Sequence, residues 1–547
     1  MPYSGTIIKA AEETKARTVE ATGESKNSNS PAYTCASYDK QLPDVQLIRK
    51  VYGGTKTMRL AGEEFLPQHP MEPDGKYDAR REQAVAYNAL KKTEGGLNGM
   101  IFRRDPTYSE DVPEELKGTD TTNGDLDNID RQGNAFPVFW RYVADNALTD
   151  GHTWVWVESP PNPATTEREE EELEIRPYWV NLKKEQVTNW RYEIRNGKPV
   201  LTLIAFREGA VEPDGDFGEK QRQRIRVLRE VRVTQTDDVA DARTRVQGEL
   251  WEYRKRDDTG LSGRQVDRWV EIERYLIDLP VTEIPVVIVY AGKTDLYESA
   301  PPLLDLAYEQ IEHYRVRSDR QKSMTFSSIA VPFMFGEGLL DDEDKPKVVW
   351  GADGMAVGND PNTNVGMMES HGYGLDATDR ELERIEGRMA SMGLALIASS
   401  QTVQPRTATE EAINKGESDA WLALFAQNLE DAANQCTEIH GTYRGLDVVG
   451  KIQLSREFYD QLIDPQMLRE LNNAVAAGNL SFETLFEELK HGRVLHVQHD
   501  AAEERARIEQ DDAAGMATAD RDMRIQELEA RLAQMGEQEE VAADNAA

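Results

Sequence analysis

The sequence holds few residues whose types and spacing could carry out chemistry. The segment Ala291-Gly292-Lys293-Thr294 resembles the end of a phosphate-binding loop, in which backbone N–H groups and a lysine hold nucleotide phosphates. The first glycine of that pattern is missing, because Val287 stands in its place, and the segment follows an apolar strand without opening a clear helix. Neither G-x-S-x-G nor H-E-x-x-H occurs. We therefore predict no nucleotide site and no catalytic residue of these classes.

Two clusters contain residue types that can bind metal ions. His491, His496 and His499 crowd together with Asp500 after an expected helix, and the segment 341–344 consists of four acidic residues. A zinc site needs a closed set of tetrahedral ligands, and a short acidic run is more typical of a solvated loop. The other carboxylates lack a partner that would mark an acid and base pair. We expect no metal site, no cofactor and no enzymatic activity.

Composition narrows the class of protein. The 547 residues suffice for two to four domains or for one extended subunit, but only 39 % are hydrophobic and 30 % are charged. The formal net charge is -35, from 99 acidic and 64 basic residues. Such a balance favours solubility and argues against a tight, non-specific DNA clamp, which needs basic residues to displace counterions.

Cysteine usage and hydropathy give expectations about the compartment. Two cysteines, Cys35 and Cys436, form no disulfide framework, which favours a reducing compartment. The segment 1–11 is too short and polar for a signal peptide, and no run of about eighteen apolar residues predicts a membrane span.

The amino-terminal half alternates between helical and strand patterns. Residues 1–40 lack periodicity and are interpreted as a flexible arm. Helical patterns cover 44–60, 77–101 and 136–148, where Gly151 ends the last one. A strand is expected at 153–157, and from 178 to 290 further strands are expected at 199–206, 225–233, 248–253, 269–275 and 284–290. The fold class is therefore predicted to be α+β.

The carboxy-terminal half is mainly helical. A helix from 299 leads through the apolar piece 331–335 into a segment rich in glycine and proline that ends at 374. The next helix carries a narrow apolar seam at 3-4-3-4 spacing, made by Leu382, Ile385, Met389, Met392 and Leu396. After a polar loop, a long helix begins near Thr409, and shorter helices are expected at 464–477 and 482–490.

This order of parts resembles that of a tailed-bacteriophage portal subunit. Local sequence adds to the resemblance, because four segments are similar to a portal-like phage family of formerly unknown function: 95–106, 128–134, 148–151 and 177–191. The stretch 476–505 is similar to the C-terminal part of many portals.

The resemblance implies an elongated subunit with a β-containing wing, a two-helix stem, a small clip and a helical C-terminal crown. The parts would be a flexible arm (1–40), the wing (41–298, β-rich at 178–290), the first stem helix (299–328), the clip (329–374), the second stem helix (375–397), the tunnel loop (398–408), a long wing helix and strand (409–462), the crown helices (463–510) and a charged tail (511–547).

The resemblance also implies which residues meet DNA. In the tunnel loop these would be Gln401, Gln404 and Arg406, whose amides and single cation suit weak, repeated contacts with phosphates. Arg384 and Arg388 either line the channel or pair with neighbouring glutamates. The apolar seam would pack against a helix of the same subunit or of a neighbour.

Function follows from the same resemblance. The chain would form a ring of about twelve subunits at one capsid vertex of the virion, assembled in the host cytoplasm, through which double-stranded DNA is packaged and ejected. Partners would be the terminase large subunit, a head–tail adaptor protein, and the major capsid and scaffolding proteins, without any membrane. The alternative is another virion or assembly protein, such as a head–tail connector, without a DNA channel.

Overall fold

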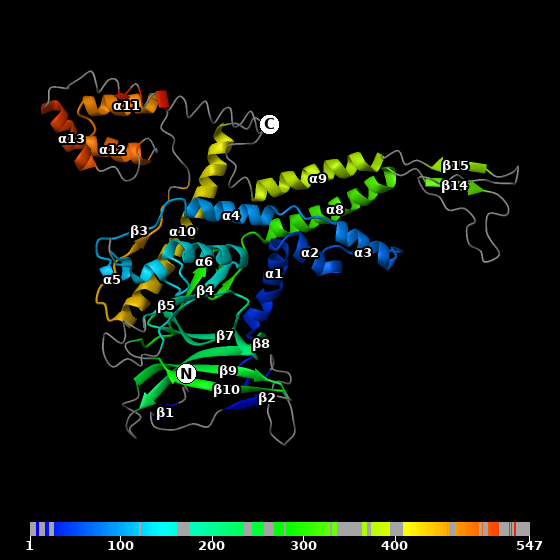
Figure 1. The fold of residues 1–547 in the computed structure, drawn as a ribbon, viewed down its shortest axis with the longest axis horizontal. Coiled ribbons are helices and arrows are strands. Elements are labelled where there is room, and N and C mark those ends of the chain that lie inside the picture. Colours follow the sequence, from blue (N-terminus) through cyan, green and yellow to red (C-terminus); the bar gives the residue numbers. More distant parts are fainter. Residues whose placement is uncertain are drawn as a thin grey trace. The chain divides into compact units, whose positions relative to one another are not determined.

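The computed structural model describes two compact units, Met1–Arg456 and Glu457–Ala547. The described residues are 7–9, 17–20, 27–119, 122–160, 175–234, 243–255, 267–277, 281–328, 331–335, 364–368, 373–393, 408–456, 458, 465–491, 495, 501–513, 524–525, 527 and 530–531. The fold class is α+β, with antiparallel sheets and long helices in the first unit (Figure 1).

The first unit is built on a seven-stranded sheet. Its main path runs in the order β2-β10-β9-β8-β7-β6, and β1 pairs with β8 in parallel. The strands are rich in β-branched and aromatic residues, which favour pleated structure. Their bounds are β1 Ile7–Lys9, β2 Thr18–Glu20, β6 Val187–Arg195, β7 Lys198–Asp214, β8 Gly218–Thr234, β9 Arg243–Arg254 and β10 Arg268–Leu276.

A three-stranded sheet, β11-β4-β5, covers part of the larger sheet. It consists of β4 His152–Glu158, β5 Tyr178–Leu182 and β11 Val286–Tyr290. Trp154 and Trp156 of β4 share one apolar core with Ile204 and Phe206 of β7. A second cluster on the large sheet contains Trp251 and Trp269 with Ile225 and Val227.

Helices of the N-terminal half lie to one side of the large sheet (Figure 1). They are α1 Ala36–Tyr52, α2 Thr55–Ala61, η1 Gly62–Glu64, α3 Asp74–Gln83, α4 Ala89–Ile101, α5 Glu114–Lys117, η2 Asp125–Asn128 and α6 Phe136–Asp150, and α6 packs against β4 and β11. Gly151 ends α6 in a left-handed conformation, with φ at 89°, as the sequence predicts. A side chain there would clash with the backbone of Ala300, whose carbonyl oxygen would lie 2.5 Å from an added Cβ, so only glycine fits this corner.

The C-terminal part of the first unit contains three long helices. α8 (Leu304–Ser328) leads into β14 (Val331–Phe335), which pairs with β15 (Asn364–Met368), and α9 (Tyr373–Met392) follows. Figure 1 shows α8 and α9 side by side, with β14 and β15 beyond their ends. The helix α10 (Ala408–Arg444) packs against β11 and β4, and β16 (Ile452–Gln453) pairs with β3 (Thr107–Tyr108). A small pair, β12 (Lys293–Asp295) and β13 (Glu298–Ser299), precedes α8.

The second unit contains α11 (Pro465–Ala476), α12 (Phe482–His491) and α13 (Ala501–Ala513). Its core is small: Leu468, Leu485 and Phe486 are buried, and the rings of Phe482 and Phe486 lie 5.8 Å apart. Within the described residues of both units, no helix is long and apolar enough to cross a membrane.

Several features differ from the sequence-based expectations. Residues 1–40, expected to be a flexible arm, supply β1, β2 and the start of α1, because edge positions of the large sheet offer them backbone hydrogen bonds. The structure has two further strands, at 178–182 and 187–195, and β7 and β8 extend well beyond the expected 199–206 and 225–233. The strand candidates 348–350 and 355–357 lie outside the described residues.

Candidate functional site

The hairpin formed by α8 and α9 is the candidate functional element, and ion pairs fix its geometry. His313 Nε2 lies 3.0 Å from Glu386 Oε1, and Arg388 Nε donates to Glu309 Oε2 at 2.9 Å. Arg320 reaches Asp379 near the other end, with Nη2 3.2 Å from Oδ2. Partner numbers rise on α8 as they fall on α9, so the two helices are antiparallel.

The apolar seam of α9 is partly covered. Ile385 and Met389 are 0 % and 1 % exposed, and they lie on the helix that contacts α8, where Ile311 and Tyr314 are also buried. Leu382 is half-buried, whereas Met392 is 41 % exposed. Leu396 lies outside the described residues. A single chain therefore buries the middle of the seam and leaves Met392 open.

The two arginines expected near DNA have different surroundings. The Arg388 side chain is 31 % exposed and contacts Glu309 and Glu312 of α8 and Glu381 of its own helix. Hydrogen bonding to Glu309 raises the pKa of Arg388. Arg384 is 72 % exposed and lies 3.6 Å from Glu381. Of the two, Arg384 is thus the cation that remains accessible to a phosphate.

The remaining expected DNA contacts, Gln401, Gln404 and Arg406, lie outside the described residues. The structure describes the helices on either side of this loop, since α9 ends at Met392 and α10 begins at Ala408. The loop therefore connects the candidate hairpin directly to the long helix that crosses the β-rich body.

The hairpin is anchored on the N-terminal helices through α8. Gln310 is fully buried and accepts a hydrogen bond from the backbone N–H of Leu90 at 3.0 Å. The carboxylate of Glu72 accepts hydrogen bonds from Arg80 Nη2 at 2.9 Å and from Lys322 Nζ of α8 at 3.0 Å. Burial alone would raise the pKa of Glu72, but the hydrogen bonds from Arg80, Lys322 and His69 lower it to about 2. Buried Gln310 and the charge-assisted contact of Lys322 with the buried side chain of Glu72 therefore hold α8 against the N-terminal helices along much of its length.

A second buried cluster holds the C-terminal end of α10. Asp125 Oδ2 lies 2.8 Å from His440 Nε2, and Arg444 donates to both carboxylate oxygens at 2.7 and 2.8 Å. Burial would raise the pKa of Asp125, yet His440 and Arg444 lower it to about 2. Burial lowers the pKa of His440. The cluster fixes α10 against η2 across more than 300 residues of chain.

Local sequence patterns give little sign of these anchors. Glu309 and Glu312 lie one helical turn apart on α8, which is the one local signal that two carboxylates could face an arginine of a partner helix. The partners of His440 and Gln310 are too remote in sequence for any local pattern to reveal them.

The segment that resembles a phosphate-binding loop does not form one. The N–H groups of Ala291 and Gly292 both donate to the carbonyl of Gly151, at 2.8 and 3.0 Å, so they are unavailable to a phosphate. Lys293 lies in β12 with its Nζ 5.1 Å from the centre of the Tyr290 ring. Among the side chains that the structure describes, no group of three or more His, Cys, Asp or Glu could hold a metal ion. The side chains of the 491–499 histidine cluster lie outside that set.

Comparisons with known proteins give one family match. A family model described as "Domain of unknown function (DUF4055)" matches residues 302–443, which span α8, the β14–β15 pair, α9 and nearly all of α10. No curated protein matches the chain.

Among solved structures, the chain is similar to three from gene transfer agent (GTA) particles. Each comparison covers 78 % of this chain and 95 % of the other: the virion of the native particle (12 % identity, TM-score 0.33), the neck of the empty particle computed with C6 symmetry (11 %, 0.34) and the neck of the native particle computed with C12 symmetry (12 %, 0.33).

Proposed function

We propose that this chain is a virion structural protein, and more specifically a portal subunit. In this proposal about twelve copies form a ring at one vertex of a phage-like particle, and double-stranded DNA passes through the centre during packaging and ejection. The observation that carries the proposal is the antiparallel α8–α9 hairpin, with a small two-stranded module beyond its ends and the 37-residue helix α10 behind it.

This arrangement supports the proposal because each part has a role in a conduit. A helical hairpin that is held to the N-terminal helices through α8 can line a channel with α9, and the β14–β15 module beyond it can present a docking surface outside the body. The module would contact the terminase large subunit and then a head–tail adaptor protein. The sequence resemblance to portal subunits assigns the same parts in the same order.

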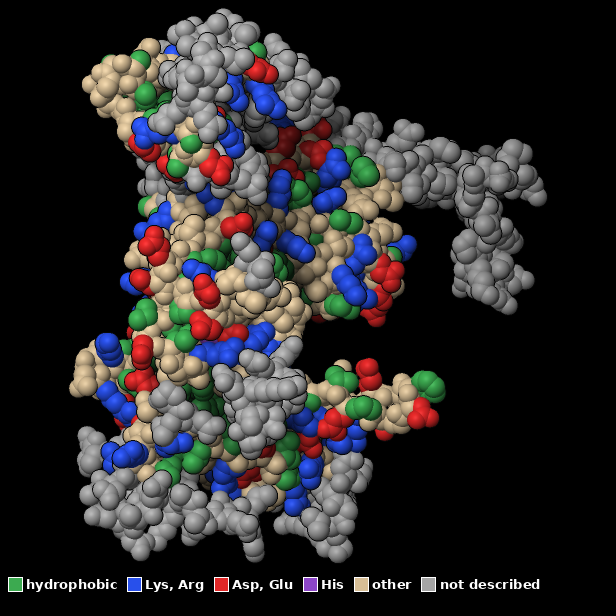
Figure 2. All heavy atoms as spheres, turned by 60° about the vertical axis from the view of Figure 1, so that its left-hand side comes forward, with side chains coloured by type: hydrophobic (Ala, Val, Ile, Leu, Met, Phe, Trp, Pro, Cys, Tyr) green, Lys and Arg blue, Asp and Glu red, His purple; other side chains and the backbone are tan. Residues whose placement is uncertain are grey.

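Charge supports a conduit over a clamp. The described part of α8 carries four acidic and four basic residues, and α9 carries five acidic and three basic ones, so the hairpin has no surplus of cations. On the face drawn in Figure 2, Lys and Arg side chains are interspersed with Asp and Glu. A surface of this kind contacts phosphates weakly, which permits DNA to move along it.

The loop before α10 would make the closest contacts with DNA, through Gln401, Gln404 and Arg406. Deleting 401–406 is expected to leave rings intact while packaging or retention of DNA falls. Normal packaging by the deletion variant would overturn this assignment of the loop, without touching the ring itself.

The decisive experiment is native mass spectrometry together with electron microscopy of the purified full-length protein. We expect a closed ring of about twelve subunits with a central hole. A monomer or dimer under all conditions would overturn the proposal. A closed ring without a hole wide enough for a DNA duplex would favour a head–tail connector that lacks a channel.

A further inference from the structure

The β7–β8 hairpin extends beyond the rest of the large sheet. β6 pairs with β7 only up to Phe206, and β9 pairs with β8 only from Arg224 onward. Between these points β7 and β8 form a two-stranded ribbon in which no residue from 207 to 224 is buried. An isolated two-stranded ribbon is marginally stable in water, so this one is suited to packing against another surface.

The two faces of the ribbon differ. One face carries the cross-strand pairs Glu208–Arg224 and Glu212–Lys220, and Glu212 also contacts Arg222 and Arg224. The opposite face carries Gly209, Val211 and Pro213 beside two glutamines, and Val211 is 60 % exposed. At the turn, Phe217 is completely exposed, between Asp216 and Gly218. Phe217 is therefore an exposed apolar side chain at the tip of an otherwise acidic turn, available to pack against another surface.

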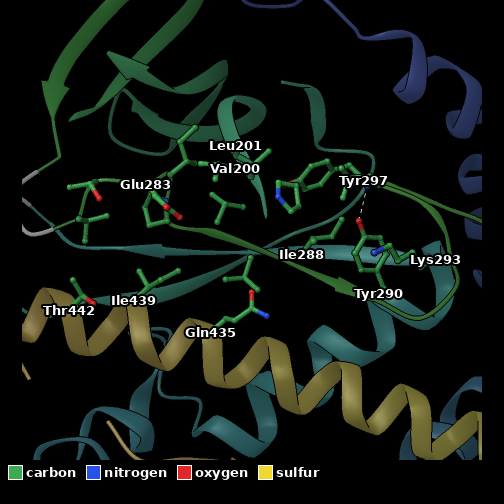
Figure 3. A pocket seen from close by; sticks show the side chains of 18 residues that line it. Val200, Leu201, Glu283, Ile288, Tyr290, Lys293, Tyr297, Gln435, Ile439 and Thr442 are labelled. Atoms are coloured by element: carbon green, nitrogen blue, oxygen red, sulfur yellow. Dashed lines mark hydrogen bonds between the residues drawn. The ribbon is translucent and has the colours of Figure 1, made fainter. Parts of the chain in front are cut away.

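The same chain carries a pocket of about 440 Å³ that could accept such a side chain. It is lined by the start of β7, by β11 and by α10 (Figure 3). Tyr290, Tyr297 and Lys293 lie at one end of the pocket, and Glu283 and Thr442 lie at the other. The hydroxyl of Tyr290 accepts the N–H of Tyr297 at 2.8 Å, which fixes the two rings.

Exposed apolar side chains flank this pocket. On the edge strand β6, Tyr192 and Ile194 are 42 % and 62 % exposed. They pair across the strand with Leu201 and Pro199, which line the pocket. The ring of Tyr192 lies 5.1 Å from that of Tyr297. The apolar surface is therefore larger than the pocket alone, as expected of an interface.

Phe217 and the pocket lie at opposite ends of β7. The pocket is lined by Pro199, Val200 and Leu201 at the start of β7, whereas Phe217 follows its last residue, Asp214. At roughly 3.3 Å per residue, these ends are about 40 Å apart along the strand. Because β7 is held in a paired sheet, Phe217 cannot reach the pocket of its own chain.

We propose that the β7–β8 hairpin of one copy inserts Phe217 into this pocket of the next copy, at the end formed by Tyr290, Tyr297 and Lys293. The phenyl ring packs against the two tyrosines, and the acidic turn, with Asp214 and Asp216, lies against the exposed ammonium of Lys293. A contact between different surfaces of identical chains repeats head to tail and closes a ring when the rotation permits. The inference rests on the ring proposed above and names the surfaces that close it.

Disulfide trapping between separate proteins tests the contact. Phe217→Cys and Lys293→Cys variants are mixed, assembled and oxidised, and a covalent dimer joining one copy of each is expected. Mixing Phe217→Cys with Leu60→Cys, whose site on α2 is 78 % exposed, should give none. Wild-type protein, in which Cys436 is buried and Cys35 half-buried, is the blank. Equal cross-linking of the Leu60→Cys mixture, or none with Lys293→Cys, would overturn the interface.

A second measurement uses assembly itself. Phe217→Asp should weaken each contact about tenfold or more, so rings appear only at higher protein concentration in native mass spectrometry. Val138→Asp, at a site on α6 that is 59 % exposed, is the matched control and should assemble as wild type. If wild-type protein forms rings and Phe217→Asp forms them equally well, this interface is wrong and the ring stands. If wild-type protein forms no ring, the proposed function itself fails.

Discussion

Arg388 of α9 donates from Nε to Glu309 of α8 at 2.9 Å, while its Nη2 reaches Glu312 at 3.1 Å. These contacts join the two helices of the hairpin. They also pair Arg388 with glutamates, whereas the sequence alone is equally compatible with Arg388 lining a channel. The pairing also separates Arg388 from Arg384, which lies one turn earlier and is 72 % exposed.

The first prediction compares these two arginines. Arg388→Gln removes the contacts with Glu309 and Glu312 and should lower the free energy of unfolding, because these contacts join the two helices. Arg384→Gln should change it by less than about 0.5 kcal/mol. Urea unfolding followed by circular dichroism measures both. Equal losses for the two variants would contradict the inter-helix role of Arg388.

The second prediction concerns the seam. Ile385→Asp places a carboxylate where the side chain is 0 % exposed, which should cost roughly 3 kcal/mol or more. Met392→Asp, on the same helix at 41 % exposure, is the control and should cost little in the isolated chain. Circular dichroism and size-exclusion chromatography separate unfolding from failed assembly. A stable, fully assembled Ile385→Asp ring would show that α9 does not pack through this face.

Local pattern predicted the elements but not their partners. The 3-4 spacing of α9, the aromatic strand 153–157 and the glycine at 151 each depend on neighbours in sequence, and the structure has all three. The division of the strands into two sheets depends on remote pairing, such as that of β4 with β11, which no local pattern encodes.

The candidate site shows the same limit. Pairing with neighbouring glutamates was one of the two alternatives for Arg384 and Arg388, and the structure has a contact of each arginine with Glu381 within the same helix. The contacts between α8 and α9 connect residues about 60 to 80 positions apart, and the buried partner of His440 is Asp125. Burial of Ile385 but not Met392 likewise depends on how α9 packs in the folded chain, not on the 3-4 spacing that both residues share.

The third prediction concerns how the stability contributed by Asp125 changes at acidic pH. The pKa of Asp125 is lowered from 3.8 to about 2, so its stabilising effect is complete above pH 4 and is lost as the pH falls through about 2. Asp125→Asn should cost about 3 kcal/mol at pH 7, because Arg444 loses its buried partner. The difference from wild type should shrink as the pH approaches 2.

Denaturant unfolding of the two proteins at pH 7, 4 and 2.5 measures this difference. Asp111→Asn, at an exposed carboxylate of the same region, is the control and should be nearly silent. A cost of Asp125→Asn that stays constant down to pH 2.5 would show that packing of the amide, and not the charge, is responsible.

The fourth prediction uses Glu94 of α4. Burial, together with the neighbouring Asp145, raises the pKa of Glu94 from 4.5 to about 9. Its ionisation is therefore resisted in the folded state, and stability should fall as the pH rises from about 4.5 toward 9, by up to about 1 kcal/mol per pH unit. Glu94→Gln should flatten that fall, whereas Glu82→Gln, at an exposed site, should not. Parallel pH profiles for both variants would rule out Glu94 as the cause.

The last prediction concerns DNA. A clamp with about six to ten phosphate contacts loses roughly a thousandfold or more in affinity between about 50 and 200 mM salt, because counterions are released from each phosphate. With 99 acidic residues against 64 basic ones and Arg388 held by glutamates, we expect the ring to bind duplex DNA weakly, with a slope of about one or two contacts per engaged subunit. Fluorescence anisotropy of labelled duplex at several salt concentrations measures the slope. Arg406→Gln and Arg384→Gln should make it shallower, while Arg388→Gln should leave it unchanged in rings that still assemble. Nanomolar affinity with a steep slope would instead reveal a basic gripping surface and overturn the conduit.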